Sequence, residues 1–297
     1  MQSILKHKLF LIPFLILFVF VLCQPVHAKE KGFDNELFLA YDNTEDETGI
    51  YTSNLYSVGI ALYETTVGYG DYPYRLTNFF ERRTHLDFIY SYWDYEAEGL
   101  DETTGGFYQV KYSFISEGSP LLFDLGIGRF IGDGKDVIGD YGFYATAYDF
   151  AVGYYITPNS VAKLILSKTD YRLSDDTAGN ITYDENNYEL TWQHVRKIGA
   201  ENYISLLLDV EAVEVGSYSN SNVGGGIDYY VNRKVGFGFA YTAHRGDYAV
   251  TEGETVSLRA SAFIDQKFGF EAQLSHLYAD LADSDEDNIF IQGIARF

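Results

Sequence analysis

Carboxylates are the most abundant chemically active groups in this sequence. Its 297 residues contain 43 Asp and Glu against 21 Lys and Arg, which gives a formal net charge of −22 at pH 7. This charge argues against nucleic acid as a partner, because binding to phosphates requires clustered Lys and Arg. The single cysteine excludes a disulfide framework and a cysteine-ligated metal centre. The chemistries that remain are histidine-dependent catalysis, divalent-cation binding and an acid-lined path for small ions.

Catalysis would need a histidine beside a nucleophile or an acidic partner. His244, with Asp247 close by in the sequence, is the best candidate for such a pair. Ser275 and His276 are adjacent, so in an extended strand their side chains point to opposite faces. The sequence lacks a Gly-x-Ser-x-Gly motif, a His-Glu-x-x-His motif and a phosphate loop. We therefore expect no catalytic residues and no cofactor, and a hydrolase is the weakest alternative considered.

The acidic stretch 279–287 offers oxygen ligands that suit a divalent cation. Its acidic residues are Asp280, Asp283, Asp285, Glu286 and Asp287. Their spacing lacks the glycine and the closing bidentate glutamate of a calcium loop. We therefore predict no metal site, and we interpret the stretch as a solvated surface loop that can share divalent cations with lipopolysaccharide.

The elements that must position these residues are strands, because large apolar residues alternate with small or polar ones from about residue 36 onward. Between residues 235 and 242, for example, Val235, Phe237, Phe239 and Tyr241 alternate with Gly, Ala and Thr. We expect about 14 strands. They cover residues 36–42, 54–64, 83–96, 107–116, 121–131, 142–156, 161–173, 185–197, 202–215, 222–231, 234–245, 254–264, 267–278 and 288–297. The alternation in 161–173 is ambiguous, so its two faces stay unassigned.

The connections between these strands alternate between two kinds. Short turns such as 117–120 and 157–160 alternate with longer acidic connections such as 97–106 and 174–186. A soluble sandwich would also alternate along its strands, but strands of about 10–13 residues with short turns at one end are typical of outer-membrane barrels. We therefore predict an all-β fold, a transmembrane antiparallel up-and-down β-barrel.

Residues 1–28 have the features of a signal peptide. Lys6 and Lys8 precede an apolar run of 15 residues, which is shorter than the roughly 20 residues of a membrane-spanning helix. Val26 and Ala28 fit cleavage after Ala28, so the barrel is expected over residues 29–297. The last strand ends at Phe297 and resembles the terminal strand that the barrel-assembly machinery of Gram-negative bacteria recognises. We therefore expect a location in the bacterial outer membrane, in contact with its lipids and lipopolysaccharide.

One face of each expected strand is large and apolar, and the other is small or polar. In a barrel the first face contacts lipid and the second lines the interior. The interior charges assigned in this way are the acidic Asp87, Asp124, Asp149, Glu189, Asp209, Glu211, Asp228 and Glu271, and the basic Lys111, Arg259 and Arg296. Small interior residues such as Gly126 and Gly224 leave space for water. An acidic wall around a water channel predicts a preference for cations.

The connection 66–82 is unusually long for the side of the short turns. From Pro73 to Arg82 it contains a proline, a leucine, the pair Phe79-Phe80 and an arginine, and it then runs into the strand Thr84–Asp94. In this order it resembles the corresponding segment of the general porin family of Gram-negative proteobacteria. The resemblance implies a porin-like channel for the passive diffusion of small hydrophilic solutes or ions. A non-conducting structural or adhesive barrel is the main alternative.

The same connection predicts a local structure at the periplasmic mouth. Leu76, Phe79 and Phe80 have the i, i+3, i+4 spacing of one helical turn, so we expect a short helix whose apolar side packs on the barrel wall. Its basic residues are Arg75, Arg82 and Arg83. These arginines would face the acidic lumen and form a constriction. The alternative is a loop that lies outside the barrel, with the arginines at lipid headgroups.

Overall fold

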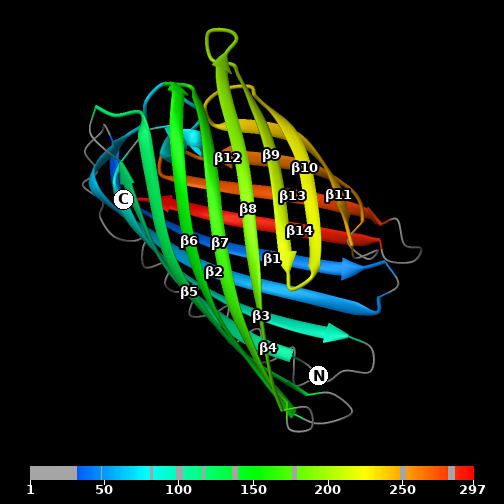
Figure 1. Cartoon of the computed structure of the whole chain (residues 1–297). Coiled ribbons are helices and arrows are strands. Elements are labelled where there is room, and N and C mark those ends of the chain that lie inside the picture. The colour runs from blue at the N-terminus through cyan, green and yellow to red at the C-terminus, as the bar shows by residue number, and fades with distance from the viewer. Residues whose placement is uncertain are drawn as a thin grey trace.

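The computed structural model describes residues 32–47, 49–80, 83–97, 103–115, 118–135, 140–175, 179–247, 252–279 and 285–297. In this part of the chain, fourteen strands form one closed antiparallel barrel (Figure 1). Every strand pairs with its neighbours in the sequence, and β1 pairs with β14 to close the ring. The predicted 14-stranded all-β barrel is therefore confirmed. The expected signal peptide, residues 1–28, lies outside the described residues.

The strands lie close to the predicted positions. They are β1 Gly32–Asp46, β2 Tyr51–Gly68, β3 His85–Ala97, β4 Thr103–Ile115, β5 Leu121–Lys135, β6 Asp140–Thr157, β7 Ser160–Asp175, β8 Gly179–Lys197, β9 Tyr203–Val215, β10 Tyr218–Tyr230, β11 Val235–Gly246, β12 Gly253–Phe263, β13 Phe268–Ala279 and β14 Glu286–Arg296. We call the end with the short turns and Phe297 the turn end, and the opposite end the loop end.

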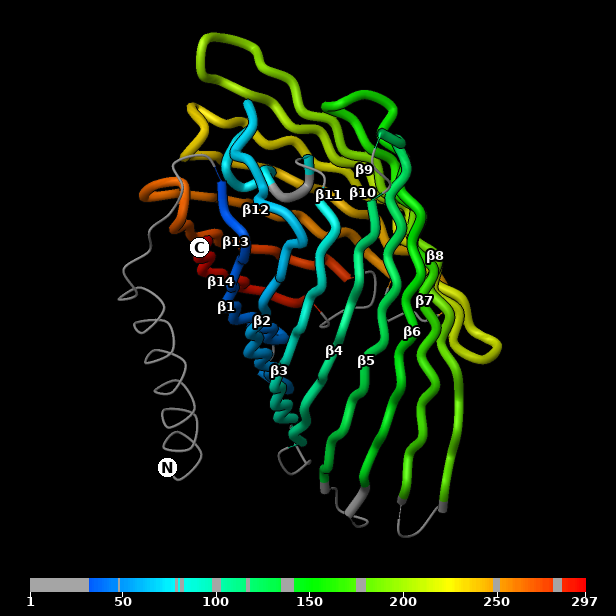
Figure 2. The backbone as a smooth tube through the Cα atoms, turned by 90° about the vertical axis from the view of Figure 1, so that its left-hand side faces the viewer, coloured from blue at the N-terminus to red at the C-terminus, as the bar shows by residue number. Residues whose placement is uncertain are grey.

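The alternating sequence produces two different surfaces. Apolar side chains point outward around the ring; Leu125, Phe237 and Leu258 are 58%, 57% and 59% exposed, respectively. Such an apolar exterior is stable in contact with lipid and would be unfavourable in water. The backbone tube in Figure 2 shows that the strands enclose an interior space along their length. The other face of each strand therefore lines this interior.

The pairing of β7 with β6 shows which residues of β7 point inward, which the sequence left unassigned. Val161, Lys163 and Ile165 lie opposite Tyr155, Gly153 and Ala151, which are buried inside the barrel. Because directly paired residues in an antiparallel ladder share a face, Lys163 points into the lumen. Its inward position adds a cation that the sequence-based assignment lacked.

Strands β5–β8 reach furthest at the loop end (Figures 1 and 2). β8 begins at Gly179 instead of the predicted 185, and its ladder with β9 starts only at Glu185. Residues 179–184 therefore pair with β7 alone. This extension is rich in Asn, Thr and Asp, and past the bilayer a strand needs no apolar face.

Candidate functional site

The connection between β2 and β3 folds into the barrel at the turn end. Residues 69–80, which we call the plug, contain a 3₁₀ helix at Tyr74–Leu76 and one α-helical turn at Thr77–Phe80. The helical turns expected from the sequence are therefore present. No helix in the described part of the chain has the length and apolar character to span a membrane.

The plug packs against several sides of the barrel wall. Leu76 and Phe80 are buried in one apolar cluster with wall residues of β6 to β10. Those wall residues are Tyr155, Val161, Val195, Tyr203 and Tyr230. Tyr74 packs against Phe263 of β12 and Ile294 of β14. Because these strands lie far apart around the ring, the plug crosses the lumen and does not lie outside the barrel.

Polar contacts fix the plug to three of the short turns. The Tyr72 hydroxyl donates to the carbonyl of Pro158, at 3.2 Å, in the β6–β7 turn. Arg233, in the β10–β11 turn, donates to the carbonyls of Tyr69 and Tyr72 and lies over the Tyr74 ring. The third contact involves the β8–β9 connection. There Asp71 accepts a hydrogen bond from Lys197 Nζ at 2.9 Å.

Asp71 has a second donor, the Tyr203 hydroxyl, whose oxygen lies 2.7 Å from Asp71 Oδ1. The hydrogen bonds from Lys197 and Tyr203 lower the pKa of the Asp71 carboxyl. The group is therefore ionised at neutral pH, and this tether of the plug is complete there.

Arg75 extends from the plug into a charged cluster on β10, β12 and β13. Its Nε lies 2.9 Å from Glu271 Oε2 and its Nη1 lies 3.4 Å from Asp228 Oδ2. Arg259 Nη2 lies 2.9 Å from the other Asp228 oxygen. Burial lowers the pKa of Arg75, but the attraction of Glu271 and Asp228 outweighs this effect and raises it. A cavity of about 300 Å³ adjoins this cluster and is also lined by Gln193 of β8 and Leu207 of β9.

The other predicted basic residues have different surroundings. Arg83 donates from Nε to the carbonyl of Thr66, at 3.2 Å, so this donor atom contacts the backbone near the end of β2. Arg82 lies outside the described residues. Arg296 is buried at the turn end, where its Nε lies 2.7 Å from Glu36 Oε2. Of the three arginines predicted for the constriction, the structure thus brings Arg75 into contact with acidic wall residues.

A second inward ion-pair group surrounds Asp124. Its Oδ2 lies 3.5 Å from Lys111 Nζ and 2.5 Å from Lys163 Nζ. The pair Asp124–Lys111 was assigned to the interior from the sequence, whereas Lys163 was missed. Lys163 lies in an apolar run, Val161 to Leu166, whose composition hides the alternation.

The acidic residues nearer the loop end contact amides or lie beside one another instead. Gln109 donates to Asp149, Asn222 donates to Glu211 at 2.7 Å, and Asn187 donates to Glu211. Glu189 lies directly opposite Glu211 in the β8–β9 ladder, and Asp209 lies on the same face. Among the described residues, no Lys or Arg forms an ion pair with Asp149, Glu189, Asp209 or Glu211. We call these four the unpaired acids.

The inward histidines His85 and His244 have different partners. His244 Nδ1 lies 2.9 Å from Asn222 Oδ1 and its Nε2 lies 2.8 Å from Thr255 Oγ1, so both ring nitrogens are occupied. Asp247 instead accepts hydrogen bonds from Ser219. The sequence-based pair of His244 and Asp247 is therefore not formed. His85 pairs with Asp87 at 3.3 Å near the turn end, and its Nδ1 contacts a backbone carbonyl.

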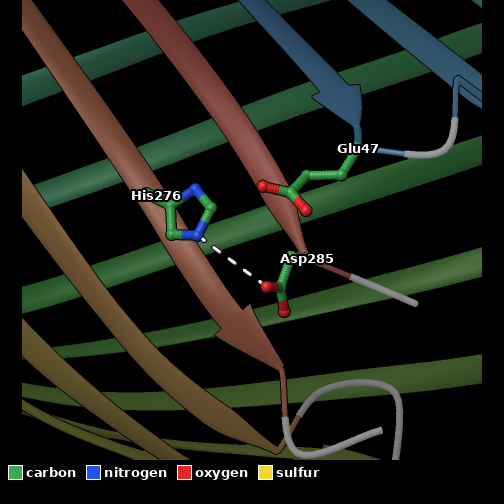
Figure 3. Close-up of side chains that lie close together, drawn as sticks. All are labelled: Glu47, His276 and Asp285. Carbon is green, nitrogen blue, oxygen red and sulfur yellow. Dashed lines mark ion pairs between the residues drawn. The ribbon is translucent and has the colours of Figure 1, made fainter. Parts of the chain in front are cut away.

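One group of side chains at the loop end could hold a cation. Glu47, His276 and Asp285 converge beside the β1–β14 seam (Figure 3), with ligand atoms within 4.8 Å of one another. His276 Nδ1 lies 2.9 Å from Asp287, which leaves Nε2 directed toward Asp285 at 3.9 Å. The sequence analysis considered Asp285 and Asp287 as cation ligands, but it did not connect them with His276 or Glu47.

The C-terminal residue completes the closing ladder. The Phe297 backbone N–H donates to the Asn35 carbonyl at 3.0 Å, and its carbonyl accepts from the N–H groups of Asp34 and Asn35. Phe297 thus continues the β1–β14 pairing by one residue beyond β14.

Comparison with known proteins supports the fold. No protein-family model and no curated protein matches the chain in sequence. Among solved structures, the outer membrane protein Omp33 of Acinetobacter baumannii has a TM-score of 0.59 at 13% identity, with 91% of this chain and 100% of that chain covered. A ΔS2S3 mutant of the monoaromatic hydrocarbon channel TodX gives 0.55 at 9% identity, covering 91% of each chain. The monoaromatic hydrocarbon channel CymD gives 0.55 at 10%, covering 93% and 92%. The chain therefore shares its barrel fold with outer-membrane channels.

Proposed function

We propose that the protein is an outer-membrane channel for the passive diffusion of small hydrophilic solutes or ions, with a preference for cations. The short turns would face the periplasm, and the loop end would face the outside. The signal-peptide features of residues 1–28 and the barrel fold support this location. Residues 73–82 resemble the corresponding segment of the general porin family, which agrees with the proposal. We also propose that the chain belongs to that family.

The observation that carries the proposal is the group of unpaired acids. Carboxylates that form no ion pair with Lys or Arg leave a negative potential in a narrow, low-dielectric lumen, and this potential concentrates cations. The acids at the turn end contribute less, because Asp124, Asp228 and Glu271 each form an ion pair with Lys or Arg.

The test is the reversal potential of single channels in a salt gradient across a planar bilayer. The wild-type protein should prefer cations, and neutralising the unpaired acids together should reduce that preference strongly. The substitutions are Asp149→Asn, Glu189→Gln, Asp209→Asn and Glu211→Gln. Glu214→Gln is the matched control, because Glu214 lies on β9 but points outward. Anion preference in the wild-type channel would contradict the proposal.

The plug favours a second candidate, a closed barrel with a structural or adhesive role. Its apolar cluster and its three tethers could block the turn end completely. Replacing residues 68–80 by a four-residue turn distinguishes the two functions. A channel with a constricted mouth conducts before the replacement and conducts more after it. A barrel closed by the plug conducts only after the replacement.

A further inference from the structure

The outward face of β5–β8 carries a group of cations that the channel function does not use. We call Arg129, Lys168 and Arg172 the basic patch. In the ladders with β6, Arg129 lies opposite Thr146, Lys168 lies opposite Tyr148, and Arg172 lies opposite Tyr144. Tyr144 and Tyr148 are exposed on the barrel exterior. The three basic side chains therefore share the outward face and occupy successive rows across β5 and β7.

The basic patch lies where the apolar exterior ends. Toward the turn end, the next outward residues are Ile127 on β5 and Leu166 and Leu164 on β7, and Ile127 is 53% exposed. Toward the loop end, β5 has one more apolar outward residue, Ile131, beside Tyr144 of β6, and the outward residues beyond them are Asp133 on β5 and Ser174 on β7. In a lipid-spanning barrel, such a change from apolar to polar residues marks the level of the headgroups. The patch is therefore placed at the headgroups of the leaflet on the loop side.

The exterior is hollowed at this place. A depression of about 770 Å³ is lined by Arg129, Arg172, Tyr144, Thr146 and Thr182, together with Asp170 and Asp184. Lys168 lies 3.1 Å from Asp170 and 3.6 Å from Asp184. Within the described residues, Arg129 and Arg172 have no ion-pair or hydrogen-bond partner. Two guanidinium groups are thus available for a ligand, on a chain whose net charge is strongly negative.

We propose that this hollow binds the phosphorylated sugar headgroup of an outer-leaflet glycolipid, the lipid A part of lipopolysaccharide. Guanidinium groups bind phosphate through paired hydrogen bonds, and a phosphorylated lipid would bring its anion to the level where Arg129 and Arg172 lie. Thr146, Thr182, Asp170 and Asp184 offer hydroxyl and carboxylate groups that suit sugar hydroxyls. The inference rests on the outer-membrane location proposed above, but it does not depend on conduction.

The test is the binding of lipid A to the purified full-length protein in detergent, with dephosphorylated lipid A and inorganic phosphate as comparison ligands. The double variant Arg129→Gln/Arg172→Gln should bind lipid A roughly thirtyfold more weakly, which is the contribution expected from two basic residues near an anionic lipid surface. The wild-type protein should bind dephosphorylated lipid A more weakly than lipid A by a similar factor. Arg196→Gln is the matched control, because Arg196 is also an exposed, outward arginine but lies near the turn end.

Three results would overturn the proposal. They are unchanged binding in the double variant, an equal loss in Arg196→Gln, and displacement of lipid A by micromolar inorganic phosphate, which would indicate a site for small anions. The heat-modifiable gel mobility of each variant shows whether it folds. If the double variant does not fold, Arg172→Lys replaces it; this variant keeps the charge but loses the paired geometry, so its binding should weaken several-fold. Because binding is measured without a conductance assay, its failure is separable from failure of the channel proposal.

Discussion

Removing the charge of Arg75 should loosen the plug. Arg75 forms ion pairs with Glu271 and Asp228, whose side chains are 13% and 6% exposed, while its own is 25% exposed. Asp228 keeps Arg259 in an Arg75→Gln variant, but Glu271 has no other ion-pair partner within the described residues. Breaking one side of a fully buried pair costs about 3–5 kcal/mol, and partial exposure reduces this to about 2–3 kcal/mol. The equilibrium for plug opening should therefore rise roughly 30- to 160-fold.

A buried thiol on the plug can measure this equilibrium. The chain has one cysteine, Cys23, which lies in the expected signal peptide, so an introduced cysteine would be the only thiol of the mature protein. Thr77 is fully buried in the plug, and in a Thr77→Cys protein a water-soluble maleimide should react only when the plug opens. We expect Arg75→Gln to accelerate labelling by the factor given above, and Arg196→Gln to leave it unchanged. Equal labelling rates with and without Arg75 would refute the assigned role of this ion pair.

Three further predictions concern pH, packing and assembly. The pKa of Asp71 is lowered by Lys197 and Tyr203, so its tether is present at neutral pH and is lost as the pH falls through this lowered pKa; the labelling rate of Thr77→Cys, divided by that of a free cysteine at the same pH, should rise there, and Asp71→Asn should remove this pH dependence. The Phe38 ring fills the space beside Gly59, so Gly59→Val should destabilise the barrel by about 1–3 kcal/mol in urea unfolding, whereas Gly106→Val, which meets only ordinary contacts, should not. Deleting Phe297 removes three backbone hydrogen bonds to Asp34 and Asn35; the protein should be exported but poorly inserted, and normal amounts of heat-modifiable barrel would contradict the role of Phe297 as an assembly signal.

The strands and their faces could be predicted from the sequence because lipid and lumen impose opposite requirements on alternate residues. Where lipid or lumen no longer constrains one face of a strand, the strand and its faces are harder to predict from the sequence. The loop-end part of β8 lies past the apolar exterior, so the Asn and Asp in Gly179–Asp184 resemble a loop. In the run from Val161 to Leu166, inward residues such as Val161 are apolar because they pack in the cluster with Leu76 and Phe80, so Lys163 is the only polar residue that marks the inward face.

The ion pairs of the lumen could not be predicted from the sequence. Arg75 and Glu271 are separated by 196 residues, and no local pattern connects them. The sequence-based set of interior acids therefore combines Asp228 and Glu271, which are neutralised, with Asp149 and Glu211, which are not. Only the three-dimensional arrangement identifies the unpaired acids as the better targets for a test of selectivity.

The contacts of the plug also impose an order on folding. The plug precedes β3 in the chain, but its partners Pro158, Lys197, Arg233 and Glu271 follow much later. Such nonlocal contacts form late, because the intervening chain must first be ordered. Because Tyr74 also packs against Ile294 of β14, all strands up to β14 must be in place before the plug can dock fully. During assembly the lumen would be wide and hydrated, and the mature mouth would form only as the last step.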